Sequence, residues 1–184
     1  MKPSFEQLEH FFRLVTEGRV TAANFQAYLE KPGRYLAGLP VTYNCDLGLV
    51  ELIKLAVGKN NLNNINSDIT QERFPLRGTG IIKANCRVEP VSASETKEQA
   101  AARLVAAGHI LADTGDLAGF QQDHPDEMEK WGWVYVLAET ARWAGPGGGV
   151  LVPGAGVSGA NRNFYLDYFR DQFNSGNGVL VRCE

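Results

Sequence analysis

A cysteine followed by an aspartate, Cys45-Asp46, stands where a predicted strand meets a predicted helix. A thiol at a helix N-terminus has its thiolate stabilised by the helix dipole and by free backbone amides, and such a thiolate is a good nucleophile. The histidines that could act as its base are His10, His109 and His124, and the sequence places none of them beside Cys45. We therefore favour the simpler interpretation, in which Cys45 is a small buried residue.

Glycines concentrate in the last third of the chain, first in Gly145–Gly149 and then at Gly154, Gly156 and Gly159. The backbone amides of the first group could cradle an anion. The second group matches the letters G-x-G-x-x-G of dinucleotide-binding loops, but no βαβ unit fits so late in the chain and no acidic residue follows about twenty positions on. We therefore predict that both groups form turns.

The densest group of potential metal ligands precedes Trp131 and consists of Asp123, His124, Asp126, Glu127 and Glu129. Oxygen and nitrogen ligands at this density could hold a divalent cation. The spacing of an EF-hand is absent, and an acid-rich helix start around Pro125 accounts for the same residues. The sequence thus predicts neither a metal site nor a cofactor.

The preferred candidate site joins flat aromatic rings to amide and guanidinium donors near the glycine-rich turns. Its members are Trp143, Gly147, Gly148, Asn161, Arg162 and Tyr165, with Tyr168 close by in the sequence. Such platforms suit the rings of sugars, peptides or nucleotides. In the alternative interpretation the aromatic residues belong to the core and Arg162 is a surface charge.

The stretch Trp131–Pro153 must position these residues, because it holds all three tryptophans and the densest apolar run. Val134–Leu137 is long enough for a buried strand and too short for a helix. Gly145–Gly149 then reverses the chain, and Val150–Pro153 extends it again. The pattern predicts a central hairpin, or a two-strand corner, on which the other elements pack.

Periodicity and capping residues predict the remaining elements. Strands are expected at 39–44, at 81–91, where apolar and polar residues alternate, and at 179–181. Helices are expected from Asp46 to Val57, from Ser94 or Thr96 to Ala107, and from Asp113 or Thr114 to about Gln122. The asparagines between 60 and 66 predict ordered turns, and residues 4–31 predict a helical hairpin. Residues 163–173 fit either a strand or a helix, and we favour a strand that runs into an irregular turn.

Composition narrows the classes of partner and compartment. A net charge of −3 without a long basic run argues against a nucleic-acid partner. No apolar run approaches the ~18 residues that span a bilayer, and the N-terminal residues MKPSFEQLEHFF do not predict a signal peptide. Three cysteines without short spacing fit reduced thiols, so we expect a soluble, cytoplasmic protein without a membrane partner.

Several segments taken in order carry a family resemblance: VTYNCDLGLVELIKL, NINSDITQERFPLRGTG, LADTGDLAGF, WVYVLAETARW and the terminal LVR. This order resembles a group of uncharacterised proteins that recur in small-genome, uncultivated bacteria, and the resemblance covers most of the chain from about Val41. That group has no assigned activity. The resemblance therefore implies a recurring fold of short strands and helices, and carries over no catalytic residue.

The sequence as a whole predicts an α+β fold, with α/β as the alternative: a helical hairpin over 1–33 and a single domain over 34–184 with a mixed, mainly antiparallel sheet and several short helices. The expected function is a non-catalytic binding or interaction module that takes a small ligand or another protein through the late glycines and aromatics. The alternative is an enzyme that acts on a small anionic or nucleotide-like ligand through Gly145–Gly159. The sequence does not decide the oligomeric state.

Overall fold

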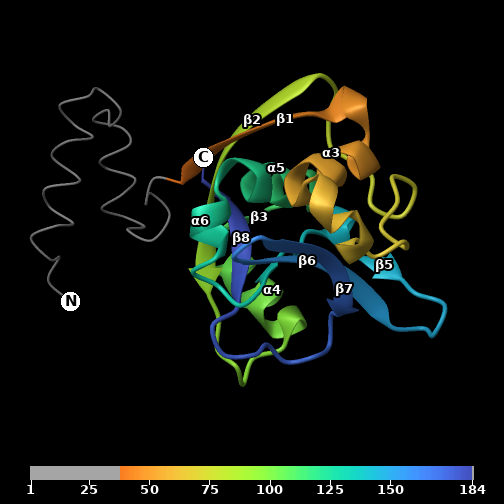
Figure 1. The fold of residues 1–184 in the computed structure, drawn as a ribbon. Helices are drawn as coiled ribbons and strands as arrows, with labels where there is room; N and C mark the ends of the chain where they lie inside the picture. The colour runs from red at the N-terminus through yellow and green to blue at the C-terminus, as the bar shows by residue number, and fades with distance from the viewer. Residues whose placement is uncertain (1–37, 184) are drawn as a thin grey trace, which may run out of the picture. The chain divides into compact units, whose positions relative to one another are not determined.

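An eight-stranded sheet organises residues 38–183, the part of the chain that the computed structural model describes (Figure 1). The strands run in the order β1-β2-β8-β4-β6-β5, while β3 pairs with β8 and β7 pairs with β6. Their bounds are β1 Leu39–Asn44, β2 Ile81–Pro90, β3 Ile110–Leu111, β4 Val134–Tyr135, β5 Trp143–Ala144, β6 Val150–Ser158, β7 Asn161–Tyr168 and β8 Gly178–Cys183. The β4–β8 pairing is parallel and the other pairings of these strands are antiparallel. The predicted α+β fold with a mixed, mainly antiparallel sheet is thus confirmed, and the predicted hairpin at 4–31 lies outside the described residues.

The helices of this part of the chain are short. They are η2 Cys45–Leu47, α3 Leu49–Val57, η3 Lys59–Asn64, α4 Lys97–Ala106, α5 Thr114–Asp123, α6 Pro125–Met128 and η4 Glu139–Ala141. Thr96 caps α4 and Asp113 caps α5, each in a reciprocal capping box, so both predicted helix starts are confirmed. The asparagine-rich connection is ordered as predicted, since the amide of buried Asn61 donates to Val57 O and Ala160 O.

The predicted cap of α3 by Asp46 is wrong. A 3-10 turn ends at Gly48, whose φ of 77° lets the chain turn again before α3 begins. The Leu49 amide is bound instead by Gln71 Oε1 at 2.9 Å, and the Asp46 carboxylate accepts from the Gly80 amide at 2.9 Å. Asp46 therefore joins the start of β2 to η2.

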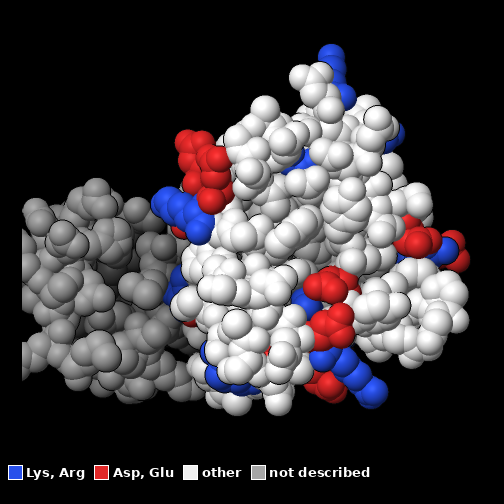
Figure 2. Space-filling model, turned by 60° about the horizontal axis from the view of Figure 1, so that its bottom comes forward, with Lys and Arg blue, Asp and Glu red and all other residues white. Residues whose placement is uncertain are grey.

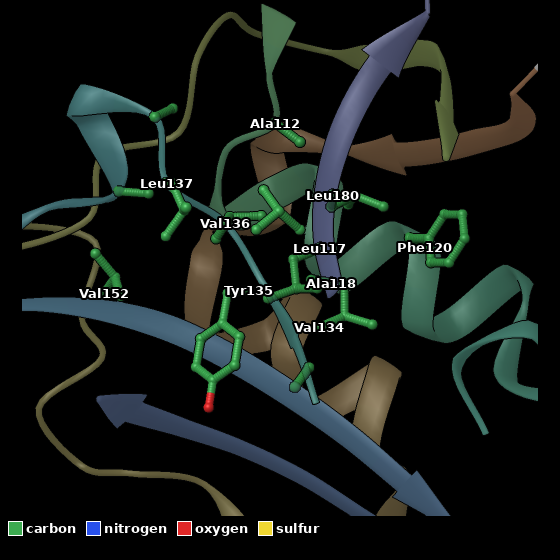
Figure 3. Close-up of a cluster of buried hydrophobic side chains, with 14 of the residues drawn as sticks. Ala112, Leu117, Ala118, Phe120, Val134, Tyr135, Val136, Leu137, Val152 and Leu180 are labelled. Carbon is green, nitrogen blue, oxygen red and sulfur yellow. The ribbon is translucent and has the colours of Figure 1, made fainter. Parts of the chain in front are cut away.

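The two faces of the sheet carry different helices. Helices α3 and α5 pack against each other on one side, and α4 lies on the other (Figure 1). Val134 of β4, Val136 just after it and Leu180 of β8 gather around Leu117 of α5 (Figure 3). Tyr135 points away from this cluster, because neighbouring residues on an extended chain alternate between faces.

The stretch Trp131–Pro153, predicted to be central, does lie inside the sheet, but the strands that form its hairpin differ from the prediction. β4 sits between β8 and β6, but it is limited to Val134–Tyr135. The chain then passes through η4, and the Gly145–Gly149 reversal joins β5 to β6. The hairpin at the glycine turn is therefore β5–β6, and β4 pairs with β6 further along.

Candidate functional site

The Cys45 thiol is not the activated nucleophile considered from the sequence. Cys45 is buried, and its Sγ donates to Arg77 O at 3.5 Å. Burial, followed by the negative charge of Asp113, raises the pKa of the thiol. These surroundings favour the neutral thiol, so Cys45 behaves as the small buried residue of the simpler interpretation.

The acidic stretch before Trp131 does not converge on a cation. Asp123 accepts from the Thr42 amide at 3.0 Å, Glu127 pairs with Lys130, and Glu129 accepts from the Gly159 amide at 2.7 Å. Within residues 38–183, no three His, Cys, Asp or Glu side chains gather as metal ligands. Asp123 therefore ties the end of α5 to β1, Glu129 binds the backbone between β6 and β7, and Glu127 pairs locally.

The residues predicted to bind a ligand do not form one site. The guanidinium carbon of Arg73 lies over the Trp143 ring, 4.1 Å from the ring centroid. Arg162 donates to Ala56 O at 3.0 Å, near the end of α3. Gly147, Gly148 and Asn161 are exposed, while Gly145 and Gly148 use their amides within the turn. Of the six predicted residues, Tyr165 lines the pocket described next, and the other five do not.

That pocket, here called the aromatic pocket, lies over β4, β6 and β7 and has a volume of about 250 Å³. It is lined by Trp133, Tyr135, Gly154, Tyr165, Leu166, Asp167 and Asn174. Register explains the convergence: Gly154 is paired with Tyr135 on one side and with Tyr165 on the other. Directly paired residues of antiparallel strands point to the same face, so the two tyrosines stand in one row on either side of the glycine.

Gly154 of β6 makes room for the Tyr135 ring. A Cβ at Gly154 would lie 2.7 Å from Tyr135 Cε1, whereas one at Gly156 would be in ordinary contact with Trp133, 3.4 Å from its Cδ2. The Tyr135 ring therefore lies across β6 (Figure 3), and its hydroxyl donates to Asp167 Oδ2 on β7 at 3.1 Å. The prediction that Gly154 and Gly156 form turns is wrong: both are in a regular strand without a positive φ, and Gly154 allows the close approach of the Tyr135 ring.

A fully buried lysine supports the pocket from α4. The Lys97 side chain is 0% exposed, and its Nζ lies 2.9 Å from Asp167 Oδ2 and 4.8 Å from the centroid of the Tyr135 ring. A buried ammonium needs such partners, because an unpaired charge is costly to remove from water. Burial, followed by the charge of Asp167, raises the pKa of the Tyr135 hydroxyl, which stays a neutral donor.

A second group of ionisable side chains lies on the opposite, α5 side of the sheet. Arg182 makes two hydrogen bonds of 2.8 Å to Asp116, which is fully buried, and the Tyr43 hydroxyl donates to the same carboxylate at 3.1 Å. Asp113 is also buried, and its Oδ2 accepts no hydrogen bond within the described residues, with Arg77 Nε 3.8 Å and Arg182 Nη2 4.0 Å away. Burial, followed by the charge of Asp116, raises the pKa of Asp113. The group holds the start of α5 against β1 and β8.

Replacement of Asp113 by asparagine is expected to change how stability depends on pH. A carboxyl whose pKa is raised in the folded state stabilises the fold below its unfolded pKa of about 3.9, and this stability is lost as the pH rises through the folded value. Asparagine keeps the oxygen that accepts from the Asp116 amide and does not ionise. Urea unfolding from pH 4 to pH 7 should therefore show that the free energy of unfolding of Asp113→Asn, relative to that of the natural protein, increases as the pH rises. A constant difference over that range would contradict the assignment.

Most residues of the aromatic pocket were not predicted from the sequence, although their spacing in the sequence gives part of the information. Trp133 and Tyr135, Gly154 and Gly156, and Tyr165 and Asp167 each stand two positions apart, the spacing of one face of a strand. Recognising the pocket from this spacing requires knowing which strands are neighbours. Lys97 carries no such signal, since a lysine in the first turn of a helix is usually exposed.

Comparison of the chain with models of protein families, with curated proteins and with solved structures finds no match. The family resemblance suggested by the sequence stays a prediction.

Proposed function

We propose that residues 38–183 form a cytoplasmic binding module that holds a small, ring-shaped ligand in the aromatic pocket. The observation that carries the proposal is the meeting of Trp133, Tyr135 and Tyr165 in one pocket with Asp167, whose carboxylate accepts from the Tyr135 hydroxyl. Ligand sites typically combine an apolar, aromatic lining with a few fixed polar groups, and this pocket has that composition. The free thiols of Cys45, Cys86 and Cys183 fit the reducing compartment.

Rigidity of the lining supports the proposal. The Trp133 and Tyr165 rings meet edge to face, with centroids 6.1 Å apart and planes at 76°. Tyr135 is held by its hydrogen bond to Asp167 and by edge contact with Phe173, whose ring centroid is 5.6 Å away. Side chains that are fixed before binding lose little conformational freedom when a ligand arrives.

Surface charge supports a small neutral or weakly charged partner over a nucleic acid. On the face shown in Figure 2, Lys and Arg are scattered, several of them beside Asp or Glu, and most of the surface between the charged side chains is uncharged. A phosphate backbone is bound by a continuous basic surface, and the chain carries a net charge of −3. Among helices of the described residues, none is long and apolar enough to cross a membrane.

A thermal-shift screen tests the proposal, because a ligand that binds the native state raises the Tm. The screen covers sugars, nucleosides, amines, phosphorylated metabolites and divalent cations, and we expect one class to stabilise the protein. Loss of an aromatic platform typically costs about 1–3 kcal/mol, so Tyr165→Ala should raise the Kd of that ligand about 5- to 150-fold.

Tyr168→Ala is the matched control for this test. Tyr168 lies on the same strand and is 52% exposed, but it is not part of the pocket lining. Its replacement should leave the Kd unchanged. A flat screen with working controls, or a ligand that binds the Tyr165→Ala variant equally well, would overturn the proposal.

A further inference from the structure

We infer that the aromatic pocket takes a neutral, polyhydroxylated ring, namely a pyranose unit of a carbohydrate. The inference rests on the proposed function and specifies its ligand class. It follows from the charge balance of the pocket, the arrangement of its rings, its free hydrogen-bonding groups and its size.

The charge balance disfavours ionic ligands. Lys97 Nζ lies 2.9 Å from Asp167 Oδ2, so the charged pair beside the pocket is neutral as a unit. An anion would meet the Asp167 carboxylate, which is 38% exposed, before it could reach the fully buried ammonium of Lys97. A cation would find Asp167 already paired and the Tyr135 ring already in contact with Lys97, 4.8 Å from its centroid.

The rings provide a corner rather than a cage. Because the planes of Trp133 and Tyr165 are 76° apart, a flat ligand can lie against the face of one ring only. A pyranose presents hydrogens bound to carbon on one face, and these carry a small positive charge that matches the electron-rich face of an aromatic ring. Its hydroxyl groups stand around the edge, where a second wall can reach them.

Polar groups are available at that second wall. Asp167 forms an ion pair with Lys97 Nζ and accepts hydrogen bonds from the Tyr135 hydroxyl and the Tyr168 amide, which leaves at least one of the four acceptor positions of a carboxylate for a ligand hydroxyl. Asn174 is exposed at the rim, and its side-chain amide makes no hydrogen bond to other described residues. A carboxylate and an amide together can accept from and donate to neighbouring hydroxyls of one sugar.

The size of the pocket fits a single ring. Its volume of about 250 Å³ lies just below the roughly 300–1,000 Å³ of pockets that enclose drug-sized ligands. The pocket is therefore suited to one pyranose unit, with the rest of a longer carbohydrate outside it.

A glycan array tests this inference with the full chain. The protein is biotinylated and displayed as a tetramer on streptavidin, because multivalent display detects single-ring affinities that are weak individually. We expect binding to a subset of neutral glycans that share a terminal pyranose, and competition by the free methyl glycoside of that sugar. Tyr165→Ala should lower the signal at least about fivefold, and Tyr168→Ala should leave it unchanged.

The outcomes separate the inference from the proposed function. Absence of binding to every neutral glycan, or binding restricted to sulfated and sialylated glycans, would overturn the carbohydrate assignment. If the thermal-shift screen then finds a nucleoside or an amine whose affinity depends on Tyr165, the binding function stands and its ligand class is different. If neither experiment finds a Tyr165-dependent ligand, both proposals fail.

Discussion

Replacement of Arg182 by methionine is expected to lower the free energy of unfolding at neutral pH by about 3 kcal/mol. Removal of one partner of a buried ion pair typically costs about 3–5 kcal/mol, and the 25% exposure of the Arg182 side chain places the effect at the lower end. The loss arises because Asp116, which is fully buried, keeps its negative charge without the two hydrogen bonds from the guanidinium. Asp113, buried three residues before it, adds a second negative charge.

The pH dependence of this loss identifies its cause. Burial and the charge of Asp116 raise the pKa of Asp113, and the charge of Arg182 opposes this shift; without Arg182 the pKa of Asp113 rises further in the folded state, so the variant loses stability as the pH rises. Urea unfolding should therefore show a large deficit at pH 7 that shrinks toward pH 4. Arg170→Met is the control: the Arg170 side chain is 88% exposed and lies 3.9 Å from Glu98, and its loss should change stability by less than about 0.5 kcal/mol. A deficit that is equal at both pH values would attribute the loss to packing instead.

Replacement of Gly154 by valine is expected to remove ligand binding and to destabilise the fold. The Cβ alone would lie 2.7 Å from Tyr135 Cε1, so the ring must leave its place across β6 and its hydroxyl must release Asp167. Overpacking of this kind costs about 1–3 kcal/mol. Urea unfolding measures the destabilisation, and the Kd of the ligand found by screening should rise at least about tenfold as the pocket closes.

Gly147→Val provides the comparison. Nothing lies within 4 Å of a Cβ at Gly147, its φ is not positive, and the residue is exposed in the β5–β6 turn. Its replacement should change stability by less than about 0.5 kcal/mol and leave the Kd unchanged. If Gly147→Val weakened binding and Gly154→Val did not, the ligand would bind at the glycine turn that the sequence suggested, and the aromatic pocket would be the wrong site.

Much of the fold could be predicted from local patterns. β1 was predicted with its observed bounds, the alternation in β2 identified its face with the buried Cys86, and Thr96 and Asp113 marked the starts of α4 and α5. Each of these features is decided by residues within one turn or one strand, so periodicity and capping suffice. The ambiguous residues 163–173 also follow the favoured interpretation, since β7 extends to Tyr168 and a turn follows.

The site could not be predicted to the same extent, because its contacts join residues far apart in the chain. Lys97 and Asp167 are drawn together by the packing of α4 on the sheet, which no local pattern specifies. Glycine has two structural uses: it adopts a positive φ in a turn, and it leaves space beneath a close neighbour. The presence of a glycine in the sequence does not tell which of the two applies. Gly154 was interpreted in the first sense and serves in the second.

The position of β8 has a consequence for how the chain is assembled during synthesis. β8 is the last in sequence of the strands in residues 38–183, yet it lies between β2 and β4 in the sheet. Until it leaves the ribosome, β2 and β4 present edges without a partner, and unpaired edges can join other chains. We therefore expect the final step of folding to follow translation of residue 183, and nascent chains stalled before Gly178 to depend on chaperones.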